Sequence, residues 1–464
     1  MNMDARSARA VQIAVGLASF LTPFLNSALS VAAPTIGREF SLGPPELALV
    51  MIAQLVSAAA LLAAFGRLSD FTGRRRIFLG GSAIFSLASL VICASATPGQ
   101  LIAARFLQGV GDAMTFGVSA AILVTAVEPE HRGRALGVNL SFVYAGLALG
   151  PLLGGVFTAW LSWRIIFVLT AALGVCAFWL VARFWKEARP TPSSRFDWLG
   201  AALFVPGTGG FILALSLQPS WLATLGMAAA LGLAPLFLAV ERRHPDPLLP
   251  PAIFRSSPRF LLANLTSVLG YTAAFSISFL MSLYFQNVRA MTPQAAGLLM
   301  LIQPVVQALG STLAGSLADR FPPARLASAG LALLGAGLLA LGGIGAGTPI
   351  LPIALVLVLL GIGFSLFASP NMSAIMACVA GERHGLASGL LATMRTVGMA
   401  LSMAFTGMML ALFVGAGRGP EAAPRILASL QGCFLLFGLT ALAGAVVSWL
   451  GSGKGAKVPN QDEP

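Results

Sequence analysis

Charged side chains are scarce in this chain: 9% of its 464 residues are Asp, Glu, Lys or Arg, whereas 57% are hydrophobic. About a quarter of the residues of a soluble domain are charged, so the composition excludes a fold that is surrounded by water. The mean hydropathy of +0.87 agrees. No polar stretch is long enough to hold a soluble catalytic domain. The sequence therefore predicts a protein whose main partner is the lipid bilayer.

Cysteine and histidine are also rare, with four and three residues. Cys93, Cys176, Cys378 and Cys433 lie within or at the ends of apolar runs and show no paired spacing. They are interpreted as packing residues, not as disulfides or metal ligands. The sequence has no HExxH, no GxSxG and no phosphate-binding loop. These absences argue against a membrane enzyme and an ATP-driven pump, and we expect no cofactor and no metal.

Long apolar runs dominate what is present. A run of about 18 or more residues can cross the hydrocarbon core as a helix, and the runs here are too long for barrel strands. The sequence predicts fourteen spans, at approximately 10–34, 47–65, 77–95, 99–126, 133–157, 164–184, 197–216, 221–240, 259–286, 293–316, 324–345, 350–377, 384–415 and 428–450. The predicted fold class is an all-α polytopic membrane protein.

The formal net charge of +12 orients these spans. With a cytoplasmic N-terminus, the inner segments hold 21 of the 28 basic residues, the outer segments hold five, and Arg105 and Arg395 fall inside spans. Such an excess follows the positive-inside rule, so both termini are expected in the cytoplasm. The basic residues report topology, and no nucleic-acid partner is expected.

A short loop sequence occurs twice. Gly66–Arg76 (GRLSDFTGRRR) joins two apolar runs, and a shorter form of it, Gly315–Arg320, follows 249 residues later. Gly109-Val-Gly111 similarly aligns with Gly361-Ile-Gly363, at an offset of 252. Repeats in the same order predict two related halves. The expected division is a six-helix bundle at 1–190, two inserted helices with linkers at 191–258, a second bundle at 259–451 and a disordered cytoplasmic tail at 452–464.

One carboxylate, Asp112, lies deep within a predicted span. Leu101, Arg105, Gln108 and Asp112 share one face of that helix. A carboxylate at membrane depth is costly, so it must be paired, protonated or functional. Two interpretations remain open: Asp112 carries a proton, or it is a static partner of Arg105 or of Arg395. Arginine stays charged and cannot itself carry the proton.

Three motifs resemble those of a known family. Gly66-x-Leu68-x-Asp70-x-x-Gly73-Arg74-Arg75 resembles the loop signature of the major facilitator superfamily, and Leu101-x-x-x-Arg105-x-x-Gln108-Gly109-x-Gly111 resembles its fourth-helix signature. Gly146-x-x-x-Gly150-Pro151-x-x-Gly154-Gly155 resembles the fifth-helix signature of its antiporters. With fourteen spans, the chain is similar to the fourteen-helix drug:proton antiporter family. The resemblance covers essentially the whole chain.

The resemblance implies roles for these motifs. The loop residues Gly66, Asp70, Gly73, Arg74 and Arg75, with Asp319 in the second copy, would form a conformational latch that stabilises the outward-facing state. Arg105 would assist proton transfer, and the fifth-helix glycines would seal the resting cavity. From physics alone, those glycines could equally serve only as a tight helix contact. The chain departs from the pattern at Phe71, where a basic residue is usual, and at Asn26, where the family often has an acid.

The expected function is proton-coupled export of small hydrophobic or amphipathic compounds, as in multidrug efflux, from the cell membrane by a monomer. The alternatives are a dedicated exporter of one metabolite or antibiotic, and a uniporter in which Asp112 is only structural. Polar groups inside spans predict the residues of the substrate cavity: Asn26, Gln54, Gln108, Asn139, Tyr144, Gln303, Gln307, Asn371, Met394 and Arg395.

Overall fold

The computed structural model describes residues 5–128, 131–187, 196–379, 384–415, 417 and 422–452, and the described part of the chain contains fourteen helical segments long enough to cross a membrane. The predicted all-α class is confirmed. The helices are α1 (Ala5–Phe40), α2 (Pro44–Thr72), α3 (Arg74–Cys93), α4 (Pro98–Ala126), α5 (Arg132–Trp160), α6 (Arg164–Phe184), α7 (Trp198–Ser216), α8 (Trp221–Glu241), α9 (Pro251–Ser256), α10 (Pro258–Ala274), α11 (Ile277–Leu283), the π-helix η2 (Tyr284–Val288), α12 (Pro293–Met300), α13 (Ile302–Ala318), α14 (Pro323–Leu341), α15 (Ile350–Met376), α16 (His384–Phe413) and α17 (Ala423–Gly451).

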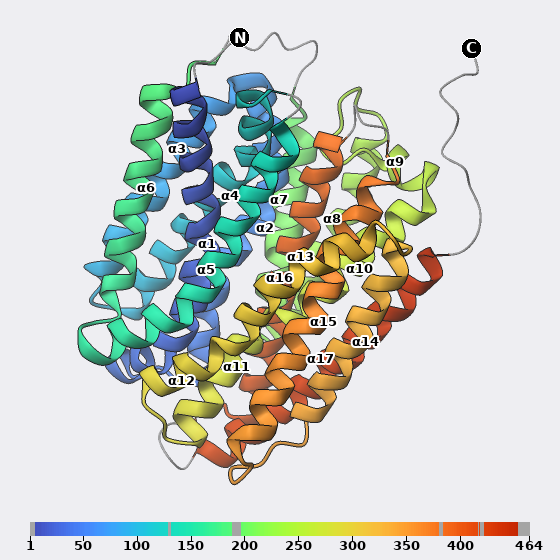
Figure 1. Cartoon of the computed structure of the whole chain (residues 1–464). Coiled ribbons are helices and arrows are strands. Elements are labelled where there is room, and N and C mark those ends of the chain that lie inside the picture. Colours follow the sequence, from blue (N-terminus) through green and yellow to red (C-terminus); the bar gives the residue numbers. More distant parts are fainter. Residues whose placement is uncertain are drawn as a thin grey trace.

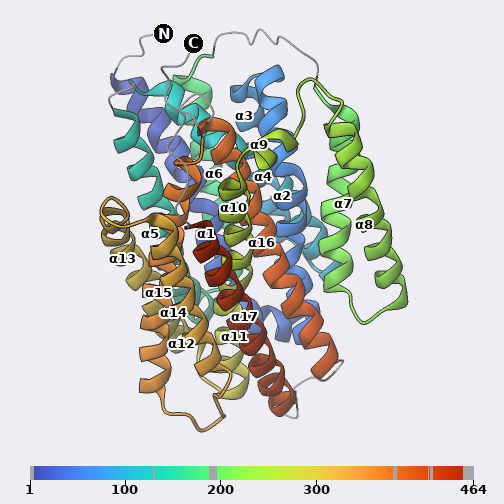
Figure 2. The ribbon, with the colours of Figure 1, turned by 90° about the vertical axis from the view of Figure 1, so that its right-hand side faces the viewer.

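Two of the fourteen spans are built from more than one helix: α10, α11 and η2 form the ninth, and α12 with α13 forms the tenth. Helices α1–α6 pack together as one half, and α10–α17 pack as the other (Figure 1). The pair α7 and α8 stands at the edge of the molecule, where α7 contacts α2 and α16 (Figure 2). The proposed boundary at 190/191 and nearly all of the proposed tail, residues 453–464, lie outside the described residues.

The repeat read from the sequence recurs as a packing pattern. A Cβ added to Gly109 would lie 2.1 Å from the carbonyl oxygen of Gln54, and one added to Gly361 would lie 2.8 Å from that of Gln303. Both distances are shorter than real Cβ contacts, so α4 approaches α2, and α15 approaches α13, more closely than a side chain would allow. A second close contact repeats as well: Gly111 of α4 lies against Gly81 of α3, and Gly363 of α15 lies against Gly330 of α14.

The connection between α2 and α3 is tighter than the sequence predicted. Residues 66–72 continue α2, and α3 begins at Arg74, so Gly73 alone makes the turn. Gly73 has φ of +95°, which a side chain would oppose. Its N–H donates to the carbonyl oxygen of Ser69 and closes the end of α2. The segment expected as a loop is therefore mostly helix with one reversal.

The two halves meet closely at the end that the charge distribution places outside the cell. A Cβ on Gly297 of α12 would lie 2.3 Å from the carbonyl oxygen of Pro151 on α5. The side chain of Gln286, in the π-helix η2, donates to the carbonyl oxygen of Val31 on α1 at 2.8 Å. In Figure 1, α11 and α12 lie beside the lower parts of α1 and α5.

The buried apolar residues divide in the same way. The largest cluster includes residues of both halves and extends to the exterior end. Two smaller clusters fill the cytoplasmic ends, one within the first half and one formed by α9, α10, α15 and α16. Apolar burial is the main force that holds elements together. At their cytoplasmic ends the halves are therefore packed within themselves, and at their exterior ends they are packed against each other.

Candidate functional site: a charged cavity between the halves

A cavity lies between the two halves, and its walls come from α1, α2, α4 and α5 on one side and from α10, α11, α13, α15 and α16 on the other. Most of its lining is aliphatic or aromatic. Five of the residues that the sequence predicted for the substrate cavity line it: Asn26, Tyr144, Gln303, Gln307 and Arg395. Asp112 lines it as well.

Asp112 projects from α4 and is 7% exposed. Its carboxylate accepts a hydrogen bond from the hydroxyl of Thr22 on α1, and the side chain of Gln54 on α2 lies beside it. Asp112 forms none of the ion pairs found in the described part of the chain. A buried carboxylate without an ion-pair partner is expensive to keep charged.

Arg105 is fully buried and lies about two helical turns before Asp112 on α4. Its three nitrogens donate to neutral acceptors: Nη1 to Gln108 Oε1 at 2.7 Å, Nε to the carbonyl oxygen of Val50 at 3.3 Å, and Nη2 to Asn26 Oδ1 at 3.4 Å. Every nitrogen of the guanidinium therefore has an acceptor. Asn26, where the family often has an acid, offers an amide oxygen instead.

Arg395 projects from α16 and faces the first half. Its Cζ lies 4.8 Å from the ring centre of Phe116 on α4, an arrangement that attracts the cation to the ring face. Its Nε is buried and has no hydrogen-bond partner. The hydroxyl of Tyr271 interacts with the guanidinium, and Asp112 and Tyr144 lie within its electrostatic reach. No carboxylate of the described residues lies within ion-pair distance of it.

The other proposed cavity residues are placed elsewhere. Gln54 is buried where α2 meets α4. Gln108 is held within the first half, because its amide donates to Ser89 at 2.7 Å while its oxygen accepts from Arg105. Asn371 donates to Ser267 and lines a second pocket. Two further residues, Asn139 and Met394, are absent from the described lining.

Four aromatic residues of the lining were not singled out from the sequence: Phe116, Tyr271, Phe275 and Phe364. Tyr271 and Phe364 pack edge to face, with ring centres 5.5 Å apart. Among thirty phenylalanines, no pattern marks the three that line the cavity. Tyrosine offered a usable signal, since the chain has only three and Tyr144 was already a candidate.

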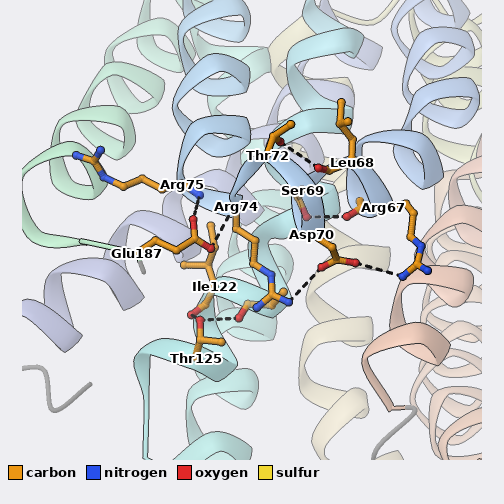
Figure 3. Close-up of polar contacts among 12 residues, drawn as sticks. Arg67, Leu68, Ser69, Asp70, Thr72, Arg74, Arg75, Ile122, Thr125 and Glu187 are labelled. Atoms are coloured by element: carbon orange, nitrogen blue, oxygen red, sulfur yellow. Dashed lines mark hydrogen bonds and ion pairs between the residues drawn. The ribbon is translucent and has the colours of Figure 1, made fainter. Parts of the chain in front are cut away.

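Three residues of the proposed latch, Asp70, Arg74 and Arg75, lie together where α2 is followed by α3 (Figure 3). Asp70 forms ion pairs with Arg74 at 3.3 Å and with Arg67 at 3.5 Å. Arg67 also pairs with Asp246, in the segment after α8, at 2.9 Å. Asp70 is thus bound to its own turn. Its counterpart Asp319 is exposed at the end of α13 and forms none of the ion pairs of the described residues.

The carboxylate of Glu187, which follows α6, holds the start of α3 (Figure 3). It accepts from the backbone N–H groups of Arg74 at 3.2 Å and Arg75 at 2.8 Å. These are among the first N–H groups of α3, which have no acceptor inside the helix. The Arg75 side chain donates to the carbonyl oxygen of Ala182 on α6 at 2.7 Å. The turn is therefore fixed to α6 as well as to the segment after α8.

The glycine motif on α5 faces two neighbours. A Cβ on Gly150 would lie 1.8 Å from the hydroxyl oxygen of Ser27, and Gly146 and Gly154 also lie too close to α1 to admit a side chain. Gly155 faces the other way, and a Cβ there would lie 2.8 Å from the carbonyl oxygen of Pro293 on α12. One motif thus packs α5 within its own half and across to the second half.

Comparisons with known proteins agree with this architecture. The family model of the Major Facilitator Superfamily matches residues 15–292 and 263–463. Similar proteins include the multidrug resistance protein Stp of Mycobacterium tuberculosis, 32% identical over 88% of this chain and 77% of that protein, and the cephamycin export protein CmcT of Amycolatopsis lactamdurans, 32% identical over 93% and 90%. The riboflavin transporter RibZ of Clostridioides difficile is 27% identical over 85% and 86%.

Among solved structures, a bacterial homologue of the human lysosomal transporter Spinster, in an inward-facing and unoccupied conformation, superposes with a TM-score of 0.72. It is 18% identical, with 97% of this chain and 98% of that chain covered.

Two related helical halves around a charged cavity, together with the family match and the relatives, define a multi-pass membrane transporter. The chain belongs to the major facilitator superfamily. The resemblance drawn from its motifs is confirmed.

Proposed function

We propose that the chain is a proton-coupled exporter of small amphipathic compounds that works by alternating access, with Asp112 as the proton carrier. The observation that carries this proposal is the position of Asp112, a buried carboxylate that lines the cavity between the halves and forms no ion pair among the described residues. A static structural partner would be expected to lie against an arginine. Arg105, the obvious candidate, is bound to neutral acceptors instead.

The geometry supports a simple exchange. A proton that binds Asp112 removes the cost of a buried charge. The transporter can therefore change conformation with the cavity closed while Asp112 is protonated. The Thr22 hydroxyl links this carboxylate on α4 to α1, and α1 contacts α11 and α12 of the other half. Arg105 lies about two helical turns before Asp112 on α4 and adds a fixed positive charge to the site.

The direction and breadth of transport are supported by the relatives and by the lining. Stp is named as a multidrug resistance protein and CmcT as an export protein for cephamycin. The largely apolar lining suits hydrophobic and amphipathic compounds. Because CmcT is named for one antibiotic class, a dedicated exporter is the second candidate, and transport assays with chemically unrelated compounds separate the two.

Two features of the setting belong to the same proposal. The two halves of one chain enclose the whole cavity, so a single copy is sufficient and we propose a monomer. The excess of basic residues in the predicted inner segments supports a location in the cytoplasmic membrane with both termini inside.

The test is substrate-triggered proton movement in proteoliposomes, measured for the native chain and for Asp112→Asn. We expect the substitution to abolish proton movement, because an amide cannot take up and release the proton. Glu128→Gln is the matched control, since Glu128 is an exposed acid just after the same helix. Undiminished coupling in Asp112→Asn would disprove the carrier assignment. Substrate flux without any proton movement in the native chain would favour a uniporter.

A further inference from the structure

The cavity carries one charged side chain from each half. Among the described residues that line it, Asp112 is the only carboxylate and Arg395 is the only cation. They come from α4 and α16, so they face the cavity from opposite halves. The remaining polar groups are neutral hydroxyls and amides, such as Gln303 and Gln307. The cavity is thus electrically asymmetric and could orient a ligand that has charge of its own.

The two buried arginines differ in a way that matters for binding. Arg105 is fully enclosed, and all three of its nitrogens have acceptors within the protein. Arg395 lines the cavity, its Nε is buried without a partner, and the ring of Phe116 covers one face of the guanidinium. An aromatic ring attracts the charge but accepts no hydrogen bond from the edge of the guanidinium. The Nε of Arg395 is therefore left without an acceptor, and the Tyr271 hydroxyl is the polar group that interacts with the guanidinium.

A guanidinium has a preferred ligand. Its planar edge matches two anionic oxygens held in one plane, as in a carboxylate, and such paired hydrogen bonds are stronger than neutral ones. In a cavity shielded from water the attraction is less screened than at a surface. An anionic group would supply the acceptor that Nε of Arg395 lacks.

The surroundings favour a flat aromatic body on the same ligand. Phe116 lies against Arg395, and Tyr271 and Phe364 form an edge-to-face pair on the wall of the second half. Rings stacked or packed edge to face contribute beyond the area that they bury. Asp112, one helical turn from Phe116 on α4, suits a cationic group on the same molecule.

We propose that Arg395 is a substrate-binding residue that recognises a carboxylate, and that the cavity takes aromatic carboxylates, among them zwitterions whose cationic group faces Asp112. This inference rests on the proposed function, because it assigns the substrate class of the same cavity. It adds an anion site to a cavity whose carboxylate, Asp112, would by itself favour cations.

The test compares two dyes that differ only at the carboxylate. Rhodamine B has an aromatic cationic body and a free carboxylate, and in its ethyl ester the carboxylate is blocked. Binding of both to the purified full-length chain is measured by fluorescence anisotropy, without liposomes or a proton gradient. We expect rhodamine B to bind the native chain about tenfold more tightly than the ester, as a charge-assisted bidentate contact predicts.

Substitutions locate the effect. Arg395→Gln should lower the affinity for rhodamine B to that for the ester, and it should leave the affinity for the ester within about twofold. Arg395→Lys keeps the positive charge but loses the planar pair of N–H donors, so its affinity for rhodamine B should be intermediate. Arg325→Gln is the control, because Arg325 lies over Trp449 away from the cavity. It should change neither affinity.

Two outcomes would overturn the proposal: equal affinity of the native chain for acid and ester, or equal loss of both dyes in Arg395→Gln. The first comparison needs no variant, so a folding defect cannot obscure it. Because binding is measured without transport, the absence of a carboxylate preference in the native chain refutes the anion site alone. Unaltered proton coupling in Asp112→Asn refutes the carrier alone.

Discussion

At the scale of single residues, the structure separates side chains that the sequence treats alike. Arg105 and Arg395 are both cations inside spans, yet one is fully hydrogen-bonded within its half and the other faces the cavity. Gln54 and Gln303 occupy equivalent places in the repeat, yet only Gln303 lines the cavity. Neighbours in space, which one helix cannot specify, decide the role of each residue.

Asp70 provides the prediction at this scale. It is part-exposed, with 42% of its side chain accessible, and its ion pairs with Arg67 and Arg74 are local. Exposed pairs of this kind contribute about 0–1 kcal/mol, so Asp70→Asn should hardly change thermal stability. Transport should nevertheless fall strongly if the carboxylate latches another conformation, while dye binding persists. The measurement is export from proteoliposomes beside a melting curve.

Asp246→Asn serves as the comparison, because Asp246 also pairs with Arg67, at 2.9 Å. If Asp70 acts only by holding Arg67, the two substitutions should have similar effects. A fully active Asp70→Asn would reduce this loop to a topology signal.

At the scale of elements, glycines determine how closely the helices pack. On α5, Gly146, Gly150 and Gly154 lie against α1, and Gly155 lies against α12. Small residues allow such approach in membranes, where lipid gives helices no hydrophobic reason to associate. The sequence predicted a tight helix contact at these glycines, here called the seam, and in the structure its partners are α1 and α12. The seam therefore links packing inside one half to contact between the halves.

Gly150→Ala should destabilise the α1–α5 contact. The added methyl would lie 1.8 Å from the hydroxyl oxygen of Ser27, so one helix must shift, and overpacking of this kind costs about 1–3 kcal/mol. Gly137→Ala on the same helix is the control, because a Cβ there meets nothing within 4 Å. The melting temperature in detergent should fall for the first and stay unchanged for the second.

Combining Gly150→Ala with Ser27→Ala should recover part of the loss, since the hydroxyl is the nearest obstacle. Equal melting temperatures for Gly150→Ala and Gly137→Ala would show that the seam is looser than the structure indicates.

At the scale of the whole molecule, the two ends of the interface between the halves differ. The shared apolar cluster extends to the exterior end, where Gly297 contacts Pro151, whereas separate clusters fill the cytoplasmic ends. Two rigid halves that are joined at one end can rock about the cavity between them. The architecture thus fits a state in which the exterior end is closed.

Gly297→Val should shift the protein toward states with an open exterior end. A Cβ at this position would lie 2.3 Å from the carbonyl oxygen of Pro151, so the larger side chain would penalise only the closed contact. A single cysteine placed at Ser278, which lines the cavity, should then react faster with a membrane-impermeant thiol reagent added outside. This assay is done in a background in which the four native cysteines are replaced by serine.

Gly389→Ala is the control in the same half, because a Cβ at Gly389 meets nothing within 4 Å. It should leave the labelling rate unchanged. A Gly297→Val protein that labels no faster than the control would contradict a closing role for the α5–α12 contact.

The sequence by itself determined the fourteen spans, the repeat and the family, because each depends on local properties. Apolar length sets a span, turn residues such as Gly73 mark its end, and motif spacing is written along one helix. Which helices lie opposite one another was decided only in three dimensions. The helical period predicted that Arg105, Gln108 and Asp112 share a face. It could not tell that Asn26 accepts a hydrogen bond from Arg105 and that Ser89 accepts one from Gln108. Nor could it tell that Asp112 faces a cavity whose opposite wall carries Arg395.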